Sequence, residues 1–292
     1  MCKLSIIIPA YNERATIGHV IEELLHLDLP CSYEVILIDD GSNDDTVEKA
    51  EKNQQDNFHI FKNAKNRGYG ASIKRGIREA VGDYVLIFDA DGQFRVEDIK
   101  FFLDTIISTN VDLVVGERKS GSDNSPLWRK PGKFFIKMLV NYLLNEKIKD
   151  INCGFRIFKR NVISRYLHLC SDKFSFSTSS TIALISRGCG YHFLPIEMNK
   201  RQGGKSAVSV QTGFQTIMLV IRLIMLFNPM KIFLPFGLLS IIVGFLWGLN
   251  YLIIGRGLSI GTLFLFIVGI FSVFFGLIAE QISELRKSQF EK

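Results

Sequence analysis

Two carboxylates directly follow a short apolar run in the segment Tyr84–Phe94, YVLIFDADGQF. The apolar and β-branched residues predict a buried strand, and Asp89 and Asp91 come one residue apart at its carboxyl end. These charges repel each other unless a cation lies between them, and Mg²⁺ binds protein carboxylates together with substrate phosphates. The pattern therefore predicts a divalent-metal site, against the alternative of a strand that ends in an ordinary Asp-Gly turn.

Polar side chains also follow the other strands predicted in the first half of the chain. Strands are predicted at 4–9, 34–39, 59–62, 84–88 and 113–117, and helices that begin near residues 17, 44, 72 and 96 alternate with them. This alternation predicts an α/β fold, with a mostly parallel sheet flanked by helices. Ligands of such sheets bind beyond the carboxyl ends of the strands. The residues expected there are Tyr11, Asn12, Glu13, Asp39, Asp40, Gly41, Ser42, Asp89 to Gln93, Glu117 and Arg118.

The segment Lys65–Ser72, KNRGYGAS, places two glycines before a predicted helix. Backbone N–H groups at a helix start favour anions. The dinucleotide-binding pattern requires a third glycine, and Ile73 stands in its place. The segment alone therefore does not indicate a dinucleotide-binding dehydrogenase.

Two long uncharged runs occupy the C-terminal part of the chain. Residues 232–255 and 258–279 contain no charged side chain, and only Arg256 and Gly257 separate them. Each run exceeds the roughly 20 residues that span a hydrocarbon core, so we predict a transmembrane hairpin rather than two buried core helices. The apolar run 4–8 is too short for a secretory signal, and the basic residues outside the hairpin exceed the one in its loop. Both termini and the N-terminal domain are therefore expected in the cytosol.

Two further segments are predicted to lie at the membrane surface. Polar residues recur every fourth position from Arg129, which gives a helix over 129–147 a basic stripe and a broad apolar face. In the second segment, 210–229, the polar residues Gln211, Gln215 and Arg222 share one side of a helix, and a helix of this kind beside a span can lie in the interface. The alternative for both is a surface helix packed on the core. The expected organisation is a cytosolic domain over 1–209, an interfacial helix over 210–229, and the hairpin with a short tail over 230–292.

The amino-acid composition and the net charge restrict the kinds of site and partner that the chain can have. The 292 residues are 47% hydrophobic, and the five cysteines form no CxxC pair, which argues against a zinc site or a disulfide framework. The net charge of +6 suits anionic lipid headgroups and equally suits anionic substrates. No nucleic-acid partner is predicted.

The motifs, in their order along the chain, resemble those of family 2 glycosyltransferases with the GT-A (Rossmann-like) fold. The motifs are SIIIPAYNE at 5–13, DDGSNDDT at 39–46 and DADGQF at 89–94. Three more, VGERKSG at 115–121, DINCGFRIFKR at 150–160 and KRQGGKS at 200–206, resemble the polyprenyl-phosphate glycosyltransferases. That subgroup includes dolichyl-phosphate mannose synthases and bacterial undecaprenyl-phosphate glucosyltransferases, and the two-span tail is similar to that of the bacterial members.

The resemblance implies inverting transfer of a sugar from a nucleotide-diphospho-sugar, GDP-mannose or UDP-glucose, to undecaprenyl or dolichyl phosphate at the cytosolic membrane face. It implies Mg²⁺ or Mn²⁺ held by Asp89, Asp91 and Gln93, as a Lewis acid for the leaving diphosphate. The acceptor phosphate is already anionic, so no side-chain general base is strictly required to activate it. Cations must hold it instead, and arginine is suited to such phosphate contacts. The implied donor-binding residues are Pro9, Ala10, Tyr11, Glu13, Asp39, Asp40, Arg67, Gly68, Asp89 and Ala90; the acceptor-phosphate residues are Arg129, Arg201, Lys205 and Ser206; and the catalytic residues are Asp91, Asp150 and Arg118.

One segment departs from the pattern of the relatives. They often carry an acidic residue on a helix where this chain has FSFSTSSTIAL, Phe174–Leu184, which is rich in hydroxyls and has no acid. Asp150 is then the one acid of the second half with a motif match. Two roles for it stay open, a catalytic one and a structural one in which it orients Arg156.

Three other functions remain to be weighed. A processive synthase of cell-envelope polysaccharide would carry a QxxRW element and more spans, and Trp128 and Trp247 stand in other contexts. A non-catalytic membrane scaffold is disfavoured by the intact carboxylate pair, and a transporter subunit by spans without internal charge. The expected location is a membrane, the bacterial inner membrane in the first instance. The sugar, the nucleotide, the carrier length and homo-oligomer formation are not fixed by the sequence.

Overall fold

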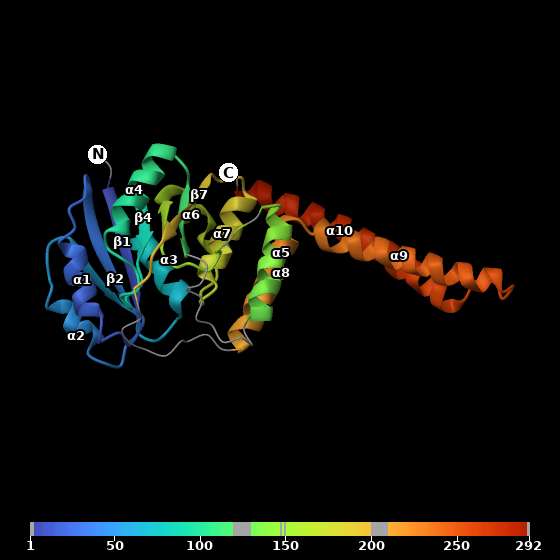
Figure 1. Cartoon of the computed structure of the whole chain (residues 1–292), viewed down its shortest axis with the longest axis horizontal. Coiled ribbons are helices and arrows are strands. Elements are labelled where there is room, and N and C mark those ends of the chain that lie inside the picture. The colour runs from blue at the N-terminus through green and yellow to red at the C-terminus, as the bar shows by residue number, and fades with distance from the viewer. Residues whose placement is uncertain (1–2, 119–129, 147, 149, 200–209, 291–292) are drawn as a thin grey trace. The chain divides into compact units, whose positions relative to one another are not determined.

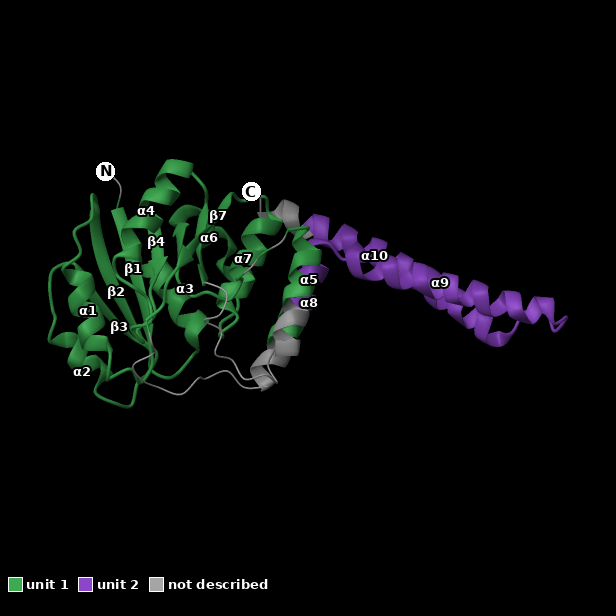
Figure 2. Cartoon of the chain, in the orientation of Figure 1, with its two compact units in different colours: residues 1–219 green, residues 220–292 purple. Residues whose placement is uncertain are grey.

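The computed structural model of the chain describes residues 3–118, 130–146, 148, 150–199 and 210–290. It divides into two compact units, residues 1–219 and residues 220–292 (Figure 2). The first unit is an α/β domain, and the second is built from long helices.

A seven-stranded sheet forms the centre of the first unit (Figure 1). The strands are β1 Lys3–Ala10, β2 Ser32–Asp39, β3 Phe58–Lys62, β4 Tyr84–Ile87, β5 Leu113–Arg118, β6 Arg156–Lys159 and β7 Tyr191–Ile196. Their order across the sheet is β3-β2-β1-β4-β6-β5-β7. All neighbouring strands are parallel except β6, which pairs antiparallel with both β4 and β5. The prediction of a mostly parallel sheet is confirmed, and β6 and β7 are additions that the sequence pattern did not predict.

The helices of the first unit are α1 Ile17–Leu25, α2 Thr46–Glu51, α3 Tyr69–Glu79, α4 Asp98–Thr109, α5 Lys130–Leu144, α6 Arg160–Tyr166 and α7 Phe176–Ser186, with a short 3₁₀ turn at Leu167–Leu169. Of these, α1, α3, α4 and α6 pack on the strands of the sheet. Helix α8, Val210–Phe227, runs from the first unit into the second. The helix predicted from Ser72 begins three residues earlier, at Tyr69, and the one predicted from Asp44 begins at Thr46. The earlier start of α3 brings Tyr69 into the site described below.

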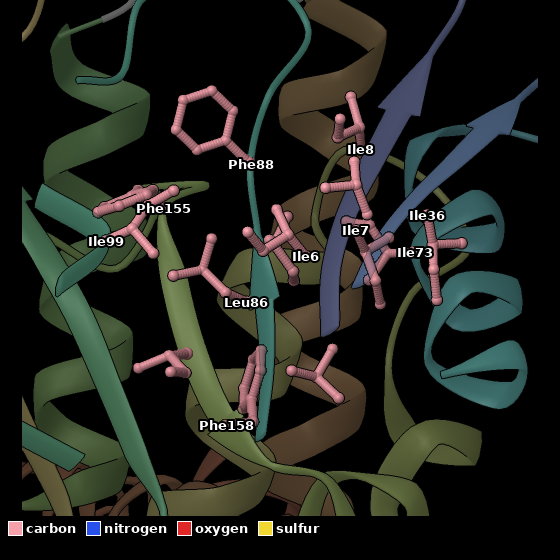
Figure 3. Packing of buried hydrophobic residues seen from close by; sticks show 14 of the residues in the cluster. Ile6, Ile7, Ile8, Ile36, Ile73, Leu86, Phe88, Ile99, Phe155 and Phe158 are labelled. Carbon is pink, nitrogen blue, oxygen red and sulfur yellow. The ribbon is translucent and has the colours of Figure 1, made fainter. Parts of the chain in front are cut away.

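The alternation of side chains in β1 determines what covers each face of the sheet. Ile7 points toward α3, where Gly76 leaves room for it, because a Cβ atom at position 76 would collide with the Ile7 side chain. Ile6 faces the other way and shares its register with Leu86 of β4. On that second face Phe102 of α4 packs against Phe155, with ring centroids 4.4 Å apart. Figure 3 shows Ile6, Ile7, Leu86 and Phe155 in the core. Burial of each large apolar side chain contributes about 1.5–3 kcal/mol.

The second unit contains the helical hairpin that the two uncharged runs predict. Helices α9 Met230–Ile253 and α10 Ile260–Phe290 run side by side along most of their length (Figure 1). Both are long and apolar enough to cross a membrane, and only 22% of the most apolar stretch of each is buried. Core helices of a soluble domain would be mostly buried, so the exposed apolar surface favours lipid as its surroundings.

Glycines form the contact between the two helices of the hairpin. A Cβ atom at Gly269 would lie 2.5 Å from the Ile241 side chain and 2.8 Å from the Gly237 carbonyl oxygen. One at Gly248 would lie 2.7 Å from Thr262. The large side chains point outward instead, Trp247 and Phe264 among them. Small residues inside and large apolar residues outside are typical of helices that pack within a bilayer.

Candidate active site

The loops that follow β1 and β2 are joined at the carboxyl edge of the sheet. The backbone N–H of Asn12 donates to the Ser42 hydroxyl at 2.9 Å, and the N–H of Asn43 donates to the Asn12 side-chain oxygen at 2.9 Å. Asn12 adopts a left-handed conformation with φ of 56°, which asparagine tolerates better than most residues. The N–H of Glu13 donates to the Thr46 hydroxyl at 2.9 Å. These bonds bring together the predicted donor-binding residues Pro9, Ala10, Tyr11, Glu13, Asp39 and Asp40.

The two aspartates at the end of β2 differ in what they bind. Both are buried. Asp39 accepts the Ser42 N–H at 3.3 Å. Asp40 accepts the backbone N–H groups of Arg67 and Gly68, at 3.0 and 2.8 Å, and the Asn63 amide at 2.8 Å. The amides of the glycine-bearing loop therefore bind a carboxylate of the chain itself, and Asp40 fixes this loop against the sheet edge.

Close packing explains the two glycines of the KNRGYGAS segment. Gly68 has φ of 109°, and a Cβ atom there would lie 2.6 Å from the Asp172 carbonyl oxygen. At Gly70 a Cβ atom would collide with the Ser171 carbonyl oxygen. The N–H of Ala71, in the first turn of α3, donates to the Asp172 carbonyl at 3.0 Å. The start of α3 is thus packed against the segment 171–173.

Asp89 lies at the centre of the site, directly after β4. The Tyr69 hydroxyl donates to its Oδ1 at 2.7 Å. Burial, and next the neighbouring Asp91 carboxylate, raise the pKa of Asp89 to about 7, and Glu13 adds to this in the same direction. The hydrogen bond from Tyr69 and the charge of Arg156 oppose the shift. Asp91 and Glu13 are therefore each close enough to Asp89 to disfavour its charge, as the convergence of the strand ends at the sheet edge predicts.

The DADGQ loop is held at three points. Thr16 donates to the Ala90 carbonyl at 2.7 Å, and the Gln93 N–H donates to Asp91 Oδ1 at 3.1 Å. The N–H of Asn199 donates to the Gln93 carbonyl at 2.8 Å. Within the described part of the chain, no group of three or more His, Cys, Asp or Glu side chains is arranged to hold a metal ion. A metal here would take two carboxylates from the chain, with Gln93 and the donor phosphates supplying further oxygens.

Arg118 and Asp150 form a two-bond ion pair beside this edge. Arg118 donates from Nε and Nη2 to the two carboxylate oxygens at 2.6 and 2.9 Å. Burial acts to raise the pKa of Asp150, but the hydrogen bonds and charge of Arg118 outweigh it and hold the pKa below its usual value. No hydrogen bond joins Asp150 to Arg156 within the described residues. Asp150 therefore orients Arg118, and it is poorly suited to take a proton.

Arg156 explains the hydroxyl-rich segment that lacks an acid. Its side chain is fully buried, and Nε donates to the Cys153 carbonyl at 3.1 Å while Nη2 donates to the same oxygen. Nη1 donates to the Ser177 carbonyl and to the hydroxyls of Ser180 and Thr181, at 2.7, 3.0 and 3.1 Å. Helix α7 thus satisfies a buried guanidinium with neutral oxygens. The signal in the sequence is the pair of neighbouring hydroxyl residues Ser180 and Thr181, whereas Ser177 contributes only its backbone carbonyl.

Tyr69 belongs to the site through its hydrogen bond to Asp89, although the sequence motifs predict no role for it beyond the glycine-bearing loop. The predicted acceptor-phosphate residues lie outside the described residues; these are Arg129, Arg201, Lys205 and Ser206.

Comparison with known proteins agrees with the motifs. The Glycosyl transferase family 2 profile matches residues 5–167, and the GtrB C-terminal hairpin profile matches residues 228–285. Dolichyl-phosphate beta-glucosyltransferase of Dictyostelium discoideum is 34% identical over 187 residues, 56% of this chain and 55% of that protein. Undecaprenyl-phosphate 4-deoxy-4-formamido-L-arabinose transferase of Yersinia pestis (strain Pestoides F) is 31% identical over 180 residues, 60% of this chain and 54% of that protein. The chain therefore spans about half the length of these relatives.

The fold also occurs in solved structures. Glucosyl-3-phosphoglycerate synthase from Mycobacterium tuberculosis, in complex with Mn²⁺, uridine diphosphate and phosphoglyceric acid, superposes with a TM-score of 0.62 over 76% of this chain and 78% of that one. The sequence identity is 16%, so the likeness is one of fold. With the profile covering more than half of the residues, the chain belongs to glycosyl transferase family 2 and carries a C-terminal hairpin of the GtrB type.

Proposed function

We propose that this protein transfers a sugar from a nucleotide-diphospho-sugar to a polyprenyl phosphate at a membrane surface. The observation that carries the proposal is the convergence of Asp89 and Asp91 with the loops 10–13 and 39–46 at one edge of the sheet. The apolar hairpin supports a lipid-linked acceptor, because a polyprenyl tail stays in the bilayer. The names of the two relatives, one a dolichyl-phosphate and the other an undecaprenyl-phosphate transferase, support the same acceptor class.

The proposal includes a divalent cation, Mg²⁺ or Mn²⁺, held by Asp89, Asp91 and Gln93. Burial, and next the repulsion by Asp91, raise the pKa of Asp89, and a bound cation would relieve this electrostatic situation. One protein of the same fold, glucosyl-3-phosphoglycerate synthase, was solved both with Mn²⁺ and with Mg²⁺, each time with uridine diphosphate. When bound, the cation would neutralise charge on the departing diphosphate.

The acceptor phosphate requires cations more than it requires a base. Arg118 is oriented by its two bonds to Asp150, which gives a guanidinium with a fixed direction beside the sheet edge. Because Asp150 stays ionised and paired, the phosphate oxygen itself is proposed as the nucleophile, in a single inverting displacement. Arg129, Arg201, Lys205 and Ser206 are proposed to complete the acceptor site. The proposal has the catalytic unit and both termini on the cytosolic face, and leaves homo-oligomer formation undecided.

For the sugar, glucose is the first candidate. One relative is named a beta-glucosyltransferase, so UDP-glucose is the donor to test first and GDP-mannose the second. The other relative is named for a modified arabinose, so the donor panel must be broad.

The test is a transfer assay with membranes that contain the protein. Membranes are incubated with a panel of labelled nucleotide sugars and with undecaprenyl or dolichyl phosphate, and the lipid is then extracted. We expect one donor to label the lipid fraction in the wild type. Labelling of a polymer instead would favour a polysaccharide synthase, and no transfer from any donor would contradict the proposal.

The matched variant in this assay is Asp91→Asn. It removes one proposed metal ligand, and we expect transfer to fall by at least about 100-fold, because Lewis-acid assistance contributes several kcal/mol. Asp104→Asn, an exposed carboxylate on α4, is the control and should keep wild-type activity. Full activity of Asp91→Asn in the presence of EDTA would exclude the metal.

A further inference from the structure

We infer that Tyr69 is a positioning residue, which holds the Asp89 carboxylate in one orientation for the metal. The inference rests on the proposed function, since it concerns the same carboxylate. It assigns a task to a residue that the sequence motifs left without one.

The hydroxyl of Tyr69 is directed at a single oxygen of Asp89. It donates to Oδ1 at 2.7 Å, which fixes the rotation of the carboxylate about its Cβ–Cγ bond. A carboxylate held in this way does not lose rotational freedom when it binds a cation. Within the described residues Oδ2 accepts no hydrogen bond from the chain, so it stays available as a ligand.

The position of the hydroxyl is itself fixed by packing. Tyr69 is the first residue of α3, and the close contact of Gly68 with the Asp172 carbonyl sets where that helix begins. The Tyr69 ring lies parallel to that of Phe174, with centroids 5.8 Å apart and planes inclined by 10°. Backbone and ring therefore determine the hydroxyl position before any metal binds.

Bare backbone at Gly154 encloses the pair from a third side. A Cβ atom there would lie 2.7 Å from Asp89 Oδ2 and 3.0 Å from the Tyr69 hydroxyl. Arg156 closes the turn that contains Gly154, because its guanidinium binds the Cys153 carbonyl and is anchored on α7. Three separate segments thus meet at Asp89: the start of α3, the turn 153–156 and the end of β4.

The test measures metal affinity directly, on the purified full-length chain in detergent. Mn²⁺ is titrated, with and without uridine diphosphate, and free Mn²⁺ is followed by electron paramagnetic resonance. Tyr69→Phe removes only the hydroxyl and keeps the ring. We expect it to bind Mn²⁺ about 10-fold more weakly, the lower end of what loss of such an outer partner causes.

Tyr33→Phe is the matched control. The Tyr33 hydroxyl donates to the Leu25 and Leu27 carbonyls at 3.1 and 3.2 Å, at the start of β2 and therefore at the opposite edge of the sheet. Its loss should lower the melting temperature and leave Mn²⁺ affinity unchanged. A purely structural role for Tyr69 predicts the same result for both variants.

Gly154→Ala provides a second, independent variant in case Tyr69→Phe does not fold. Its added methyl group would displace Asp89, so Mn²⁺ affinity should again fall. Wild-type affinity in both folded site variants would overturn the inference while the metal proposal stands. Absence of Mn²⁺ binding by the wild type, with and without the nucleotide, would overturn the metal proposal and the inference with it.

Discussion

Asp89 occupies a position where the charged form of a carboxylate is disfavoured unless a cation is bound beside it. It is largely buried, with Asp91 and Glu13 nearby, and its pKa is raised from 3.8 to about 7. The hydrogen bond from Tyr69 and the buried charge of Arg156 compensate only in part. A residue kept under such repulsion is a common feature of functional sites, where ligand binding relieves it.

The raised pKa of Asp89 predicts how stability depends on pH without metal. Between pH 3.8 and about 7 the folded state holds a proton that the unfolded state has lost, so this group's contribution to stability declines as pH rises through that window. The decline approaches about 1.4 kcal/mol per pH unit. In the Asp89→Asn variant this pH-dependent decline in stability disappears, because an amide does not titrate. The side-chain oxygen still accepts a hydrogen bond from the Tyr69 hydroxyl.

The measurement is the melting temperature of both proteins in EDTA from pH 4 to 8. The advantage of Asp89→Asn over the wild type should grow up to about pH 7 and then level off. Mn²⁺ at pH 8 should raise the melting temperature of the wild type alone. An advantage that does not change with pH would contradict the prediction.

Among the elements, α7 binds the buried side chain of Arg156, a role that its weakly amphipathic sequence does not indicate. Its residues from Phe176 to Leu184 are buried on all sides, so its hydroxyls face protein and must be satisfied there. Ser180 and Thr181 accept from Arg156. The helix therefore stabilises the turn behind Asp89 through neutral groups, without neutralising the guanidinium.

Thr181→Val tests this element. Valine has nearly the same shape, but Nη1 of Arg156 loses one of its three acceptors, the Thr181 hydroxyl at 3.1 Å, and a hydrogen bond to a charged group contributes about 1.5–3 kcal/mol. We expect the free energy of unfolding to fall by that amount, as measured by urea denaturation. In the control Thr105→Val, on the exposed side of α4, the change should stay within about 0.5 kcal/mol. Equal effects of the two substitutions would argue against a role for α7 in holding Arg156.

The close packing of α9 against α10 at Gly269 leads to a second prediction at the scale of elements. Gly269→Ala would bring a methyl group within 2.5 Å of Ile241 and 2.8 Å of the Gly237 carbonyl oxygen, and overpacking of this kind costs typically about 1–3 kcal/mol. Cysteine pairs placed across α9 and α10 should then cross-link less efficiently. Gly261→Ala, where the nearest atom lies at 3.7 Å, should cross-link as the unsubstituted hairpin does. Unchanged cross-linking in Gly269→Ala would show that the close approach of the helices is not required.

For the molecule as a whole, the proposed function depends on which side of a membrane each part of the chain faces. A hairpin of two spans would return the chain to the side from which it entered. The headgroup of the proposed polyprenyl phosphate acceptor would lie at the membrane surface, and the proposal requires the donor site to reach it there. The proposal therefore requires the first unit and the C-terminus on one side.

A topology measurement checks this requirement. A reporter fused after Lys292 should report the cytosol, and one inserted between Arg256 and Gly257 should report the opposite side. A periplasmic or lumenal signal from the C-terminal fusion would contradict the predicted topology. The same signal from both sites would exclude a hairpin that crosses the membrane twice.

The sequence by itself determined the parallel strands, the hairpin and the family. Local patterns are enough for these, because alternation, uncharged length and motif order are properties of neighbouring residues. It also led to Asp89 and Asp91, since carboxylates at a strand end converge at the sheet edge wherever strands are parallel. The sequence also shows the spacing of the α7 hydroxyls, but it does not indicate that their partner is Arg156.

Only the tertiary structure decided which strands and side chains far apart in the sequence contact each other. β6 inserts antiparallel between β4 and β5, and this brings the turn 153–156 against Asp89. The pairing of Asp150 with Arg118 rather than Arg156, and of Tyr69 with Asp89, follows from that insertion and from the packing of α3 on the segment 171–173. Such contacts depend on which strands become neighbours, and strand order is fixed by the burial of the whole core rather than by any local pattern.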